Sequence, residues 1–146
     1  MTEFNKVFID TAPLIYYLEE HPLYHNIVKK FLEECLEQDR MLVSSAITVE
    51  EYCVYPYRMG NYSLIERFYD FCEDAGIEII DIDRAIAQKA ASIRAKFKDF
   101  KAMDALQLAA ACESGCDLFL TNDRQLLQFE EIKCEIIDSI NRSTGL

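Results

Sequence analysis

Short apolar runs alternate with longer amphipathic stretches along the whole chain. The apolar runs are typical of buried strands, and they lie at residues 6–10, 41–43, 77–80, 117–120 and 134–137. The stretches between them carry apolar residues at helical spacing, which predicts helices over residues 13–18, 24–38, 48–59, 62–75, 84–97 and 102–114. Apolar strands that alternate with helices are typical of a parallel sheet covered on both faces. We therefore predict a three-layer α/β/α fold with a central parallel sheet of four to five strands, in which residues 134–137 form the fifth.

Glycine and proline positions refine the predicted helix boundaries. Pro13 suits the start of the first helix. Gly76 and Gly115 follow predicted helices and supply C-terminal stops, because glycine adopts the left-handed conformation without steric cost. Pro56 interrupts the apolar pattern of the helix predicted over residues 48–59, and proline lacks the N–H that a helix interior uses. We therefore expect a break near Pro56.

Length and composition indicate one domain spanning residues 1–146. The chain has 146 residues, of which 51% are hydrophobic and 28% charged, a profile typical of one compact domain. No linker-like stretch marks an internal boundary. No apolar run approaches the roughly 20 residues that cross a bilayer, and the first residues lack the layout of a secretion signal. We expect a cytoplasmic protein without membrane association, whose six cysteines are reduced core thiols.

The charge balance is strongly acidic. Fifteen Lys and Arg residues stand against 26 Asp and Glu residues, which gives a formal net charge of −11. A surface of this sign does not attract nucleic acid through its bulk field, so any contact with nucleic acid must rest on local positive charge. An acidic balance suits a chain that gathers carboxylates around metal ions, or one that pairs with a basic protein.

Four carboxylates follow predicted strands or begin predicted helices. Asp10 ends the first strand, and Asp123 lies three residues beyond the strand at residues 117–120. Asp104 lies in the first turn of the helix that begins near residue 102, and Glu51 lies one turn into the helix after the second strand. Ligands of open parallel sheets bind beyond the carboxyl ends of the strands. Each residue also has a structural interpretation, as a helix cap, a partner of a helix dipole, a turn residue or a solvated helix residue.

Four carboxylates at one rim would repel one another unless cations lie between them. Oxygen-only ligand sets suit hard divalent ions such as Mg²⁺ and Mn²⁺. Such ions support phosphodiester hydrolysis without a serine, cysteine or histidine nucleophile. This matters because the chain contains no Gly-x-Ser-x-Gly, Walker A, Gly-x-Gly-x-x-Gly or His-Glu-x-x-His motif.

The residues around these carboxylates resemble those of the PIN-domain ribonucleases, and within them the VapC-like toxins of toxin–antitoxin pairs. The four segments that carry the resemblance are residues 8–18, 45–52, 103–111 and 118–123. Their order and spacing extend over residues 7 to about 137. The resemblance implies the PIN fold for nearly the whole chain.

The resemblance also implies roles for individual residues. It makes Asp10, Glu51, Asp104 and Asp123 the metal-binding and catalytic carboxylates, with Thr48 fixing the register that selects Glu51 over its neighbour Glu50. Two threonines match positions that hold carboxylates or waters in place around the metal, and these are Thr11 and Thr121.

The activity implied by the resemblance is that of an endoribonuclease dependent on Mg²⁺ or Mn²⁺. It further implies an RNA substrate, a cognate antitoxin as protein partner, and a homodimer. Arg94 and Lys101 precede Asp104 and are candidates for contact with a substrate phosphate, although solvated helix cations fit the same positions.

Other functions fit the sequence less well. Ala12 stands where a haloacid-dehalogenase-type phosphatase needs a second aspartate, and Thr121-Asn122-Asp123 stands where a phospho-receiver domain needs a lysine. A catalytically silent PIN-fold module that binds RNA or protein is the main alternative. The tyrosines at positions 52, 55, 57 and 62 would serve it by stacking bases or facing a partner, and they suit core or interface packing equally. Metal-dependent turnover discriminates between the two functions.

Overall fold

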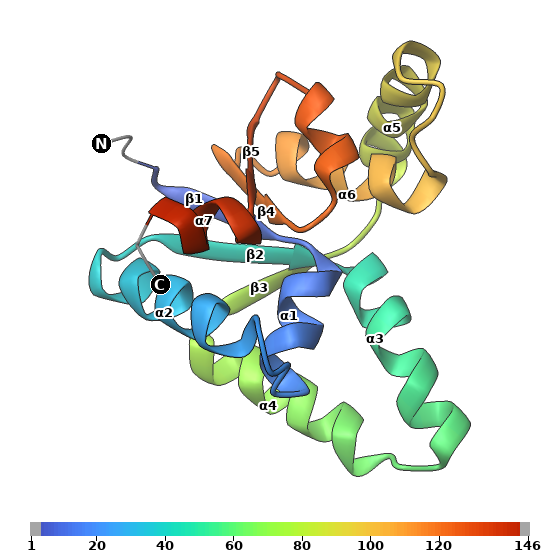
Figure 1. Ribbon diagram of the computed structural model, residues 1–146. Coiled ribbons are helices and arrows are strands. Elements are labelled where there is room, and N and C mark those ends of the chain that lie inside the picture. The colour runs from blue at the N-terminus through green and yellow to red at the C-terminus, as the bar shows by residue number, and fades with distance from the viewer. Residues whose placement is uncertain (1–3, 144–146) are drawn as a thin grey trace.

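The computed structural model describes residues 4–143 and has a five-stranded parallel sheet at its centre (Figure 1). The strands stand in the order β3-β2-β1-β4-β5, and every neighbouring pair is parallel. Their bounds are β1 Lys6–Ile9, β2 Met41–Ser45, β3 Ile77–Ile80, β4 Leu118–Thr121 and β5 Lys133–Ile136. The predicted three-layer fold and its fifth strand are confirmed.

Seven α-helices and one 3₁₀-helix connect and follow these strands within the described residues. The bounds of the first four helices are α1 Thr11–Leu18, α2 His25–Glu37, α3 Ala46–Met59 and α4 Ser63–Ala75. The later ones are α5 Arg84–Lys96, α6 Ala102–Glu113, the 3₁₀-helix η1 Arg124–Gln128 and α7 Ile137–Ser143. No helix among the described residues is long and apolar enough to cross a membrane.

Two hydrophobic cores cover the two faces of the sheet. Because side chains alternate along a strand, Val7 and Ile9 pack into the core formed with α1, α2, α3, α4 and α7, whereas Phe8 points into the other core. The second core is formed with α5, α6 and η1, and there Phe8 stacks on Phe119 of β4 with ring centroids 5.2 Å apart. Burial on both faces explains why the strands are apolar at nearly every position.

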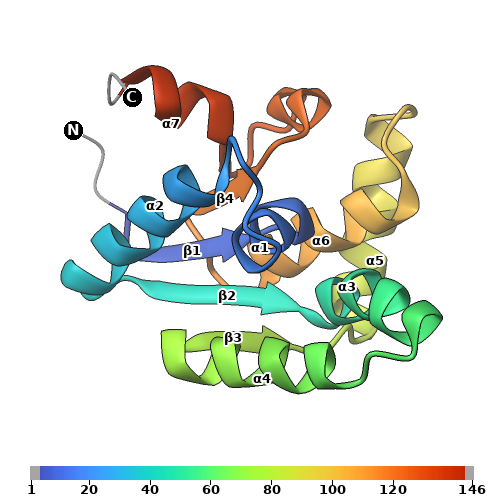
Figure 2. The same cartoon turned by 60° about the horizontal axis from the view of Figure 1, so that its bottom comes forward.

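The order in which strands are added to the sheet reverses at β1. The chain moves from β1 outward through β2 to β3, and then returns to the other side of β1 to form β4 and β5. The connections that leave β1 and β4 therefore turn in opposite directions, and this switch point is where open parallel sheets hold their ligands. Figure 2 shows α1, α3 and α6 gathered at the carboxyl ends of β1 and β2.

The prediction of a break near Pro56 is wrong. Helix α3 continues from Ala46 to Met59 with Pro56 inside it. Pro56 lies within a turn of the helix end and is buried, and Tyr52, one turn earlier, stacks on Phe68 of α4 at 4.8 Å. Packing of this face against α4 offsets the hydrogen bond that proline removes.

The other differences from the predicted elements are small. Most bounds agree within a few residues, and Gly76 ends α4 with φ 69°, as expected. The sequence did not predict η1 and α7, which are both short. The six cysteines are free thiols, as expected, four of them buried and two half-buried.

Candidate active site

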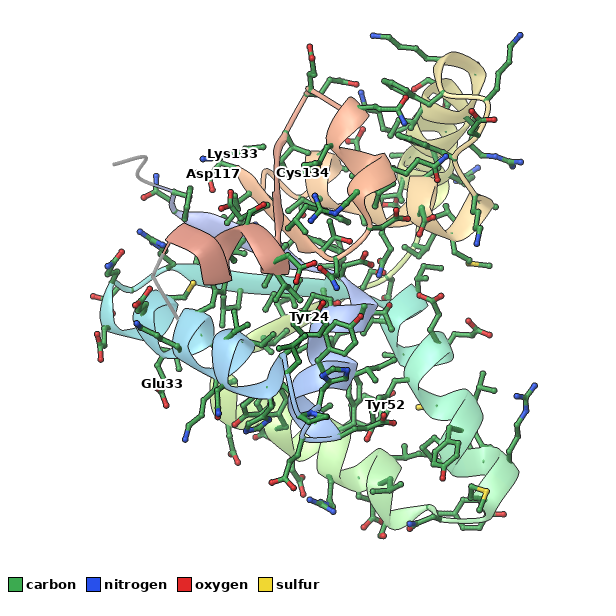
Figure 3. All side chains as sticks on the ribbon, in the orientation of Figure 1. Tyr24, Glu33, Tyr52, Asp117, Lys133 and Cys134 are labelled. Carbon is green, nitrogen blue, oxygen red and sulfur yellow. The ribbon has the colours of Figure 1, made fainter. Side chains whose placement is uncertain are left out.

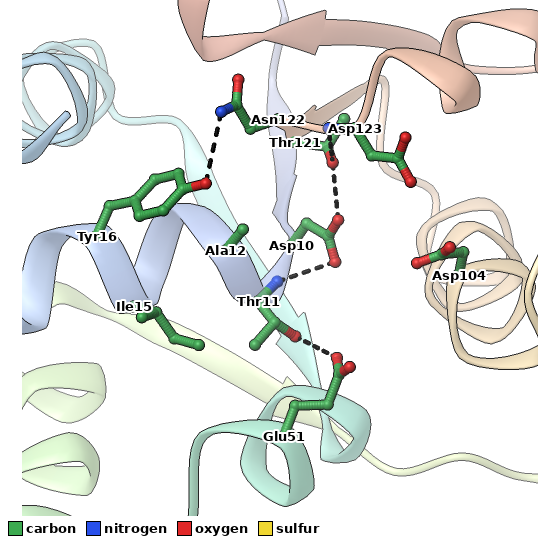
Figure 4. Close-up of a pocket in the computed structure, with 10 residues that line it drawn as sticks. All are labelled: Asp10, Thr11, Ala12, Ile15, Tyr16, Glu51, Asp104, Thr121, Asn122 and Asp123. Atoms are coloured by element: carbon green, nitrogen blue, oxygen red, sulfur yellow. Dashed lines mark hydrogen bonds between the residues drawn. The ribbon is translucent and has the colours of Figure 1, made fainter. Parts of the chain in front are cut away.

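A pocket of about 540 Å³ opens at the carboxyl ends of β1 and β4, and all four predicted carboxylates line it (Figure 4). Each carboxylate comes from a different segment: Asp10 between β1 and α1, Glu51 from α3, Asp104 from the first turn of α6, and Asp123 between β4 and η1. Carboxylates that the sequence places after strands or in the helices therefore meet at one edge of the sheet. No Lys, Arg or His is among the described residues that line the pocket.

Asp10 is the most deeply placed of the four carboxylates. It is 8% exposed, and it accepts hydrogen bonds from the Thr121 hydroxyl at 2.8 Å and from the Thr11 backbone N–H at 2.9 Å. Burial raises the pKa of Asp10 to about 6, the two hydrogen bonds oppose this shift, and the charges of Asp104 and Glu51 add to it. Asp10 is therefore a buried anion whose nearest charged neighbours are also anions.

The structural interpretation of these aspartates is confirmed, and it is compatible with their place at the pocket. Asp10 is the N-cap of α1, and Asp123 is the N-cap of η1, where its carboxylate accepts from the Gln125 N–H at 3.0 Å. Asp104 lies in the first turn of α6, where a negative charge complements the helix dipole. Capping fixes the backbone at each point and so fixes where the carboxylate stands at the rim of the pocket.

Glu51 and Asp104 complete the rim from helices α3 and α6. The Thr11 hydroxyl donates a 2.7 Å hydrogen bond to Glu51 Oε1. Partial burial raises the pKa of Asp104, the charges of Asp123 and Glu51 raise it further, and Lys101 lowers it. The neighbouring Glu50 lines a separate cavity with apolar residues of α3 and α4. Glu51, not Glu50, therefore belongs to the pocket.

Beneath the carboxylates lies a buried polar network that the sequence analysis missed. Its centre is Gln107 of α6, which is 1% exposed. Its amide nitrogen donates to the hydroxyls of Thr48 (2.8 Å) and Thr11 (3.3 Å), and its oxygen accepts from the Ser45 hydroxyl. The same nitrogen lies 3.4 Å from Asp10 Oδ1. Gln107 thus links α6 to the start of α1 and to the junction of β2 with α3. The sequence does contain a signal for Gln107, because it is a polar residue within an otherwise apolar run, three positions after Asp104.

The wall on the α1 side was also missed. Tyr16 and Asn122 line the pocket, and the Asn122 side-chain nitrogen lies 3.5 Å from the Tyr16 hydroxyl. The Tyr16 ring packs against Tyr24 and His21, with centroids 4.8 and 4.9 Å away. No signal in the one-dimensional pattern distinguishes Tyr16 from the neighbouring core aromatics of α1.

The predicted phosphate contacts lie outside the pocket. Arg94 and Lys101 are exposed on α5 and just before α6, and neither lines the cavity. Lys101 is close enough to Asp104 to lower its pKa. Of the four tyrosines, Tyr52 is buried in the core, whereas those at positions 55, 57 and 62 are more than half exposed.

The donor set of the pocket fits a hard divalent cation. The four carboxylates and the two threonine hydroxyls offer only oxygen, and no ion pair within the described part of the chain neutralises any of the four. In this arrangement no three described His, Cys, Asp or Glu side chains converge closely enough to enclose one ion. In proteins Mg²⁺ is bound through one or two carboxylates, with waters and substrate oxygens in the other positions.

Comparison with known proteins identifies the class. The family model of the PIN domain matches residues 7–132, so the chain belongs to the PIN-domain family. The resemblance recognised in the sequence is therefore confirmed at the level of the family. A search of the curated proteins finds no match.

Solved structures with a similar fold include chains of toxin–antitoxin complexes and a VapC toxin. A chain of VapBC2 from Rickettsia felis, bound to a promoter DNA fragment, superposes with a TM-score of 0.74 at 16% identity, covering 90% of this chain and 98% of that one. DNA-bound VapBC from Salmonella typhimurium superposes with a TM-score of 0.66 at 22% identity. The match covers 91% of this chain and 98% of that one. VapC20 from Mycobacterium tuberculosis, a toxin that cleaves the sarcin-ricin loop, superposes with a TM-score of 0.59 at 11% identity. The match covers 77% of this chain and 86% of that one.

Proposed function

We propose that this protein is a metal-dependent endoribonuclease and the toxin of a toxin–antitoxin pair. One observation carries the proposal: carboxylates from four separate segments line one pocket at the switch point of the sheet, and the deepest of them, Asp10, is a buried anion beside other anions. Holding these charges together costs stability unless a cation joins them. The PIN family and the VapC-type fold support the same conclusion.

Asp10, Glu51, Asp104 and Asp123 would hold Mg²⁺ or Mn²⁺ in this site. A bound divalent cation supplies Lewis-acid chemistry, since it polarises a phosphodiester and lowers the pKa of a water. The chain itself positions the carboxylates: Thr121 fixes one oxygen of Asp10, and Thr11 fixes Glu51. We assign both threonines the role of orienting the metal-binding carboxylates.

The proposed partners are RNA as substrate and a cognate antitoxin as inhibitor. The toxin–antitoxin and VapBC structures among the neighbours support the antitoxin. Because the pocket is lined by four acids and no base, an inhibitor that fills it should place an Arg or Lys beside Asp10. The homodimer and the cytoplasmic location stay predictions.

The decisive experiment is cleavage of a labelled total RNA pool by the purified protein. We expect cleavage with Mn²⁺ or Mg²⁺ and none with EDTA. Asp104→Asn should lower the rate on the order of 10²–10³-fold, because loss of a charged ligand removes several kcal/mol of transition-state stabilisation. The matched control is Glu113→Gln, which removes one acid from the exposed far end of the same helix and should cleave like the wild type.

Two outcomes of this experiment contradict the proposal. Equal cleavage by the wild type and Asp104→Asn would indicate a contaminating nuclease. Absence of metal-dependent cleavage in both, together with Mn²⁺ binding at the pocket by calorimetry, would favour a binding module that does not hydrolyse RNA.

Adjacent glutamates offer a second test of the site. Glu51→Gln should reduce metal-dependent cleavage by at least about tenfold, because its carboxylate faces the pocket, whereas Glu50→Gln should leave the rate within about twofold of the wild type. Both variants lose the same charge from the same turn of α3, so the comparison isolates position. Equal loss in both variants would show that net charge, and not the pocket, controls the rate.

A further inference from the structure

Positive charge is concentrated in one segment of this acidic chain. Residues 84–101, which form α5 and the loop before α6, carry six of the 15 Lys and Arg residues and only one of the 26 Asp and Glu residues. This segment, here called the basic segment, has a net charge of +5 from six cations and one acid, whereas nine cations and 25 acids leave −16 on the rest of the chain. A surface that repels polyanions as a whole therefore has one region that attracts them.

Five of these six cations are exposed and take part in none of the ion pairs of the described residues, and Lys89 is the exception. Lys89 pairs with Glu131 at 2.6 Å, and Lys96 lines a cavity with the same glutamate. Arg94, Lys98 and Lys101 are exposed, and the ion pairs of the described residues include none of them.

Helical spacing places Arg94 away from the ion-paired Lys89. Ile86, Ala90 and Ile93 form the buried stripe of α5. At helical spacing, Lys89 and Arg94 lie on opposite flanks of this stripe. In Figure 3, nitrogen-tipped side chains extend into solvent from α5 and the loop that follows it. Arg94 is therefore available to a ligand on the flank opposite Glu131.

The loop that carries Lys98 and Lys101 is tied structurally to the segments of the pocket. Lys101 is the N-cap of α6, and Asp104 lies in the first turn of the same helix. The same loop also contacts η1. There the side chain of Gln125, which is two residues beyond Asp123, donates to the Asp99 carbonyl at 3.4 Å. The loop of the basic segment is thus held against both segments that carry Asp104 and Asp123.

We infer that Arg94, Lys98 and Lys101 form a docking surface for the phosphate backbone of single-stranded RNA, leading into the carboxylate pocket. This inference rests on the proposed function, and it names the surface by which that site takes its substrate. Phosphate contacts through exposed Lys and Arg are independent of base sequence and salt-dependent. They place the strand at Lys101, from which the next phosphates reach Asp104, and they offset the repulsion of the remaining surface.

The test is equilibrium binding of a labelled single-stranded RNA of about 20 nucleotides, followed by fluorescence anisotropy over a range of salt. Ca²⁺ replaces Mg²⁺, because its longer and less regular coordination supports binding but suits hydrolysis poorly. The variant is Arg94→Gln/Lys98→Gln/Lys101→Gln. The control, Lys29→Gln/Lys30→Gln/Arg58→Gln, removes the same charge from exposed positions of α2 and α3.

We expect the triple variant in the basic segment to bind at least about tenfold more weakly at low salt. The plot of the log of the association constant against the log of the salt concentration should become less steep by about 2, since each phosphate contact of a single strand contributes roughly 0.7. The control should keep the affinity and the slope of the wild type. Equal behaviour of the two variants would overturn the inference, as would binding of polyglutamate through the same three cations as tightly as RNA, which would indicate an acidic protein partner.

Failure of this inference is distinguishable from failure of the proposed function. If the wild type hydrolyses RNA with Mn²⁺ and both triple variants bind RNA alike, the ribonuclease proposal stands and the docking surface is wrong. If RNA binds through the basic segment and no metal supports hydrolysis, the docking surface stands and the ribonuclease proposal is wrong.

Discussion

Asp10→Asn is expected to abolish metal-dependent RNA cleavage and at the same time to stabilise the metal-free protein. Cleavage should fall on the order of 10³-fold, because Asp10 is the deepest carboxylate of the pocket. Stability should rise because asparagine is as good an N-cap as aspartate but carries no charge in a buried site beside Asp104 and Glu51. A loss of activity with a gain of stability separates a functional carboxylate from a structural one.

The stability gain should depend on pH with a defined sign. The pKa of Asp10 is about 6 in the folded protein against 3.8 for an unperturbed group, so between these values the folded state binds more protons than the unfolded state. The free energy of unfolding contributed by Asp10 therefore decreases as pH rises through this window, by up to about 3 kcal/mol. The free energy of unfolding of Asp10→Asn should thus exceed that of the wild type by about 1–3 kcal/mol at pH 7, and this difference should vanish near pH 4.

Urea unfolding of metal-free protein at several pH values measures this effect. The matched control is Asp83→Asn, which makes the same substitution at the N-cap of α5, where the side chain is exposed. It should change stability little and without the same pH dependence. Unfolding or marked destabilisation of Asp10→Asn would show that the hydrogen bonds from Thr121 and Thr11 outweigh the cost of burying the charge.

The sequence was sufficient to predict the fold because both periodicities are clear in it. Strands buried on both faces have to be apolar throughout, and helices that cover a sheet have to be amphipathic. The two elements that were not predicted, η1 and α7, are too short to show a period. The continuity of α3 through Pro56 depends on packing against α4, which local sequence does not encode.

The rim of the site was predictable and its support was not. Asp10 and Asp123 follow from a topological rule, because parallel strands deliver the residues after them to the same edge. Glu51 and Asp104 lie in helices, and the family resemblance selected them. Gln107 is different: its partners Ser45, Thr48 and Thr11 are distant in sequence, and only the folded chain brings them to one point. Such a buried polar residue can be suspected from its apolar neighbours, but its partners cannot be named.

Gln107→Leu is expected to destabilise the protein by about 2–4 kcal/mol, because it removes the partner of several buried polar groups at once. The Ser45 hydroxyl loses its acceptor, and the Thr48 hydroxyl loses a donor. Leucine fills a similar volume, so the loss reports hydrogen bonding more than packing. Urea unfolding measures it, and Gln88→Leu on the exposed face of α5 is the control, with an expected change within about 0.5 kcal/mol.

A second substitution at the same position separates the network from simple burial. Gln107→Glu keeps the shape and the acceptor for Ser45, but above neutral pH it places a negative charge beside Asp10 in a buried site. Its stability should therefore approach that of the wild type in mild acid, where the new carboxyl is protonated and can donate to Thr48, and should fall as pH rises. A loss of stability independent of pH would mean that Gln107 fills space rather than joins α6 to α1 and α3, the segments that carry Asp104, Asp10 and Glu51.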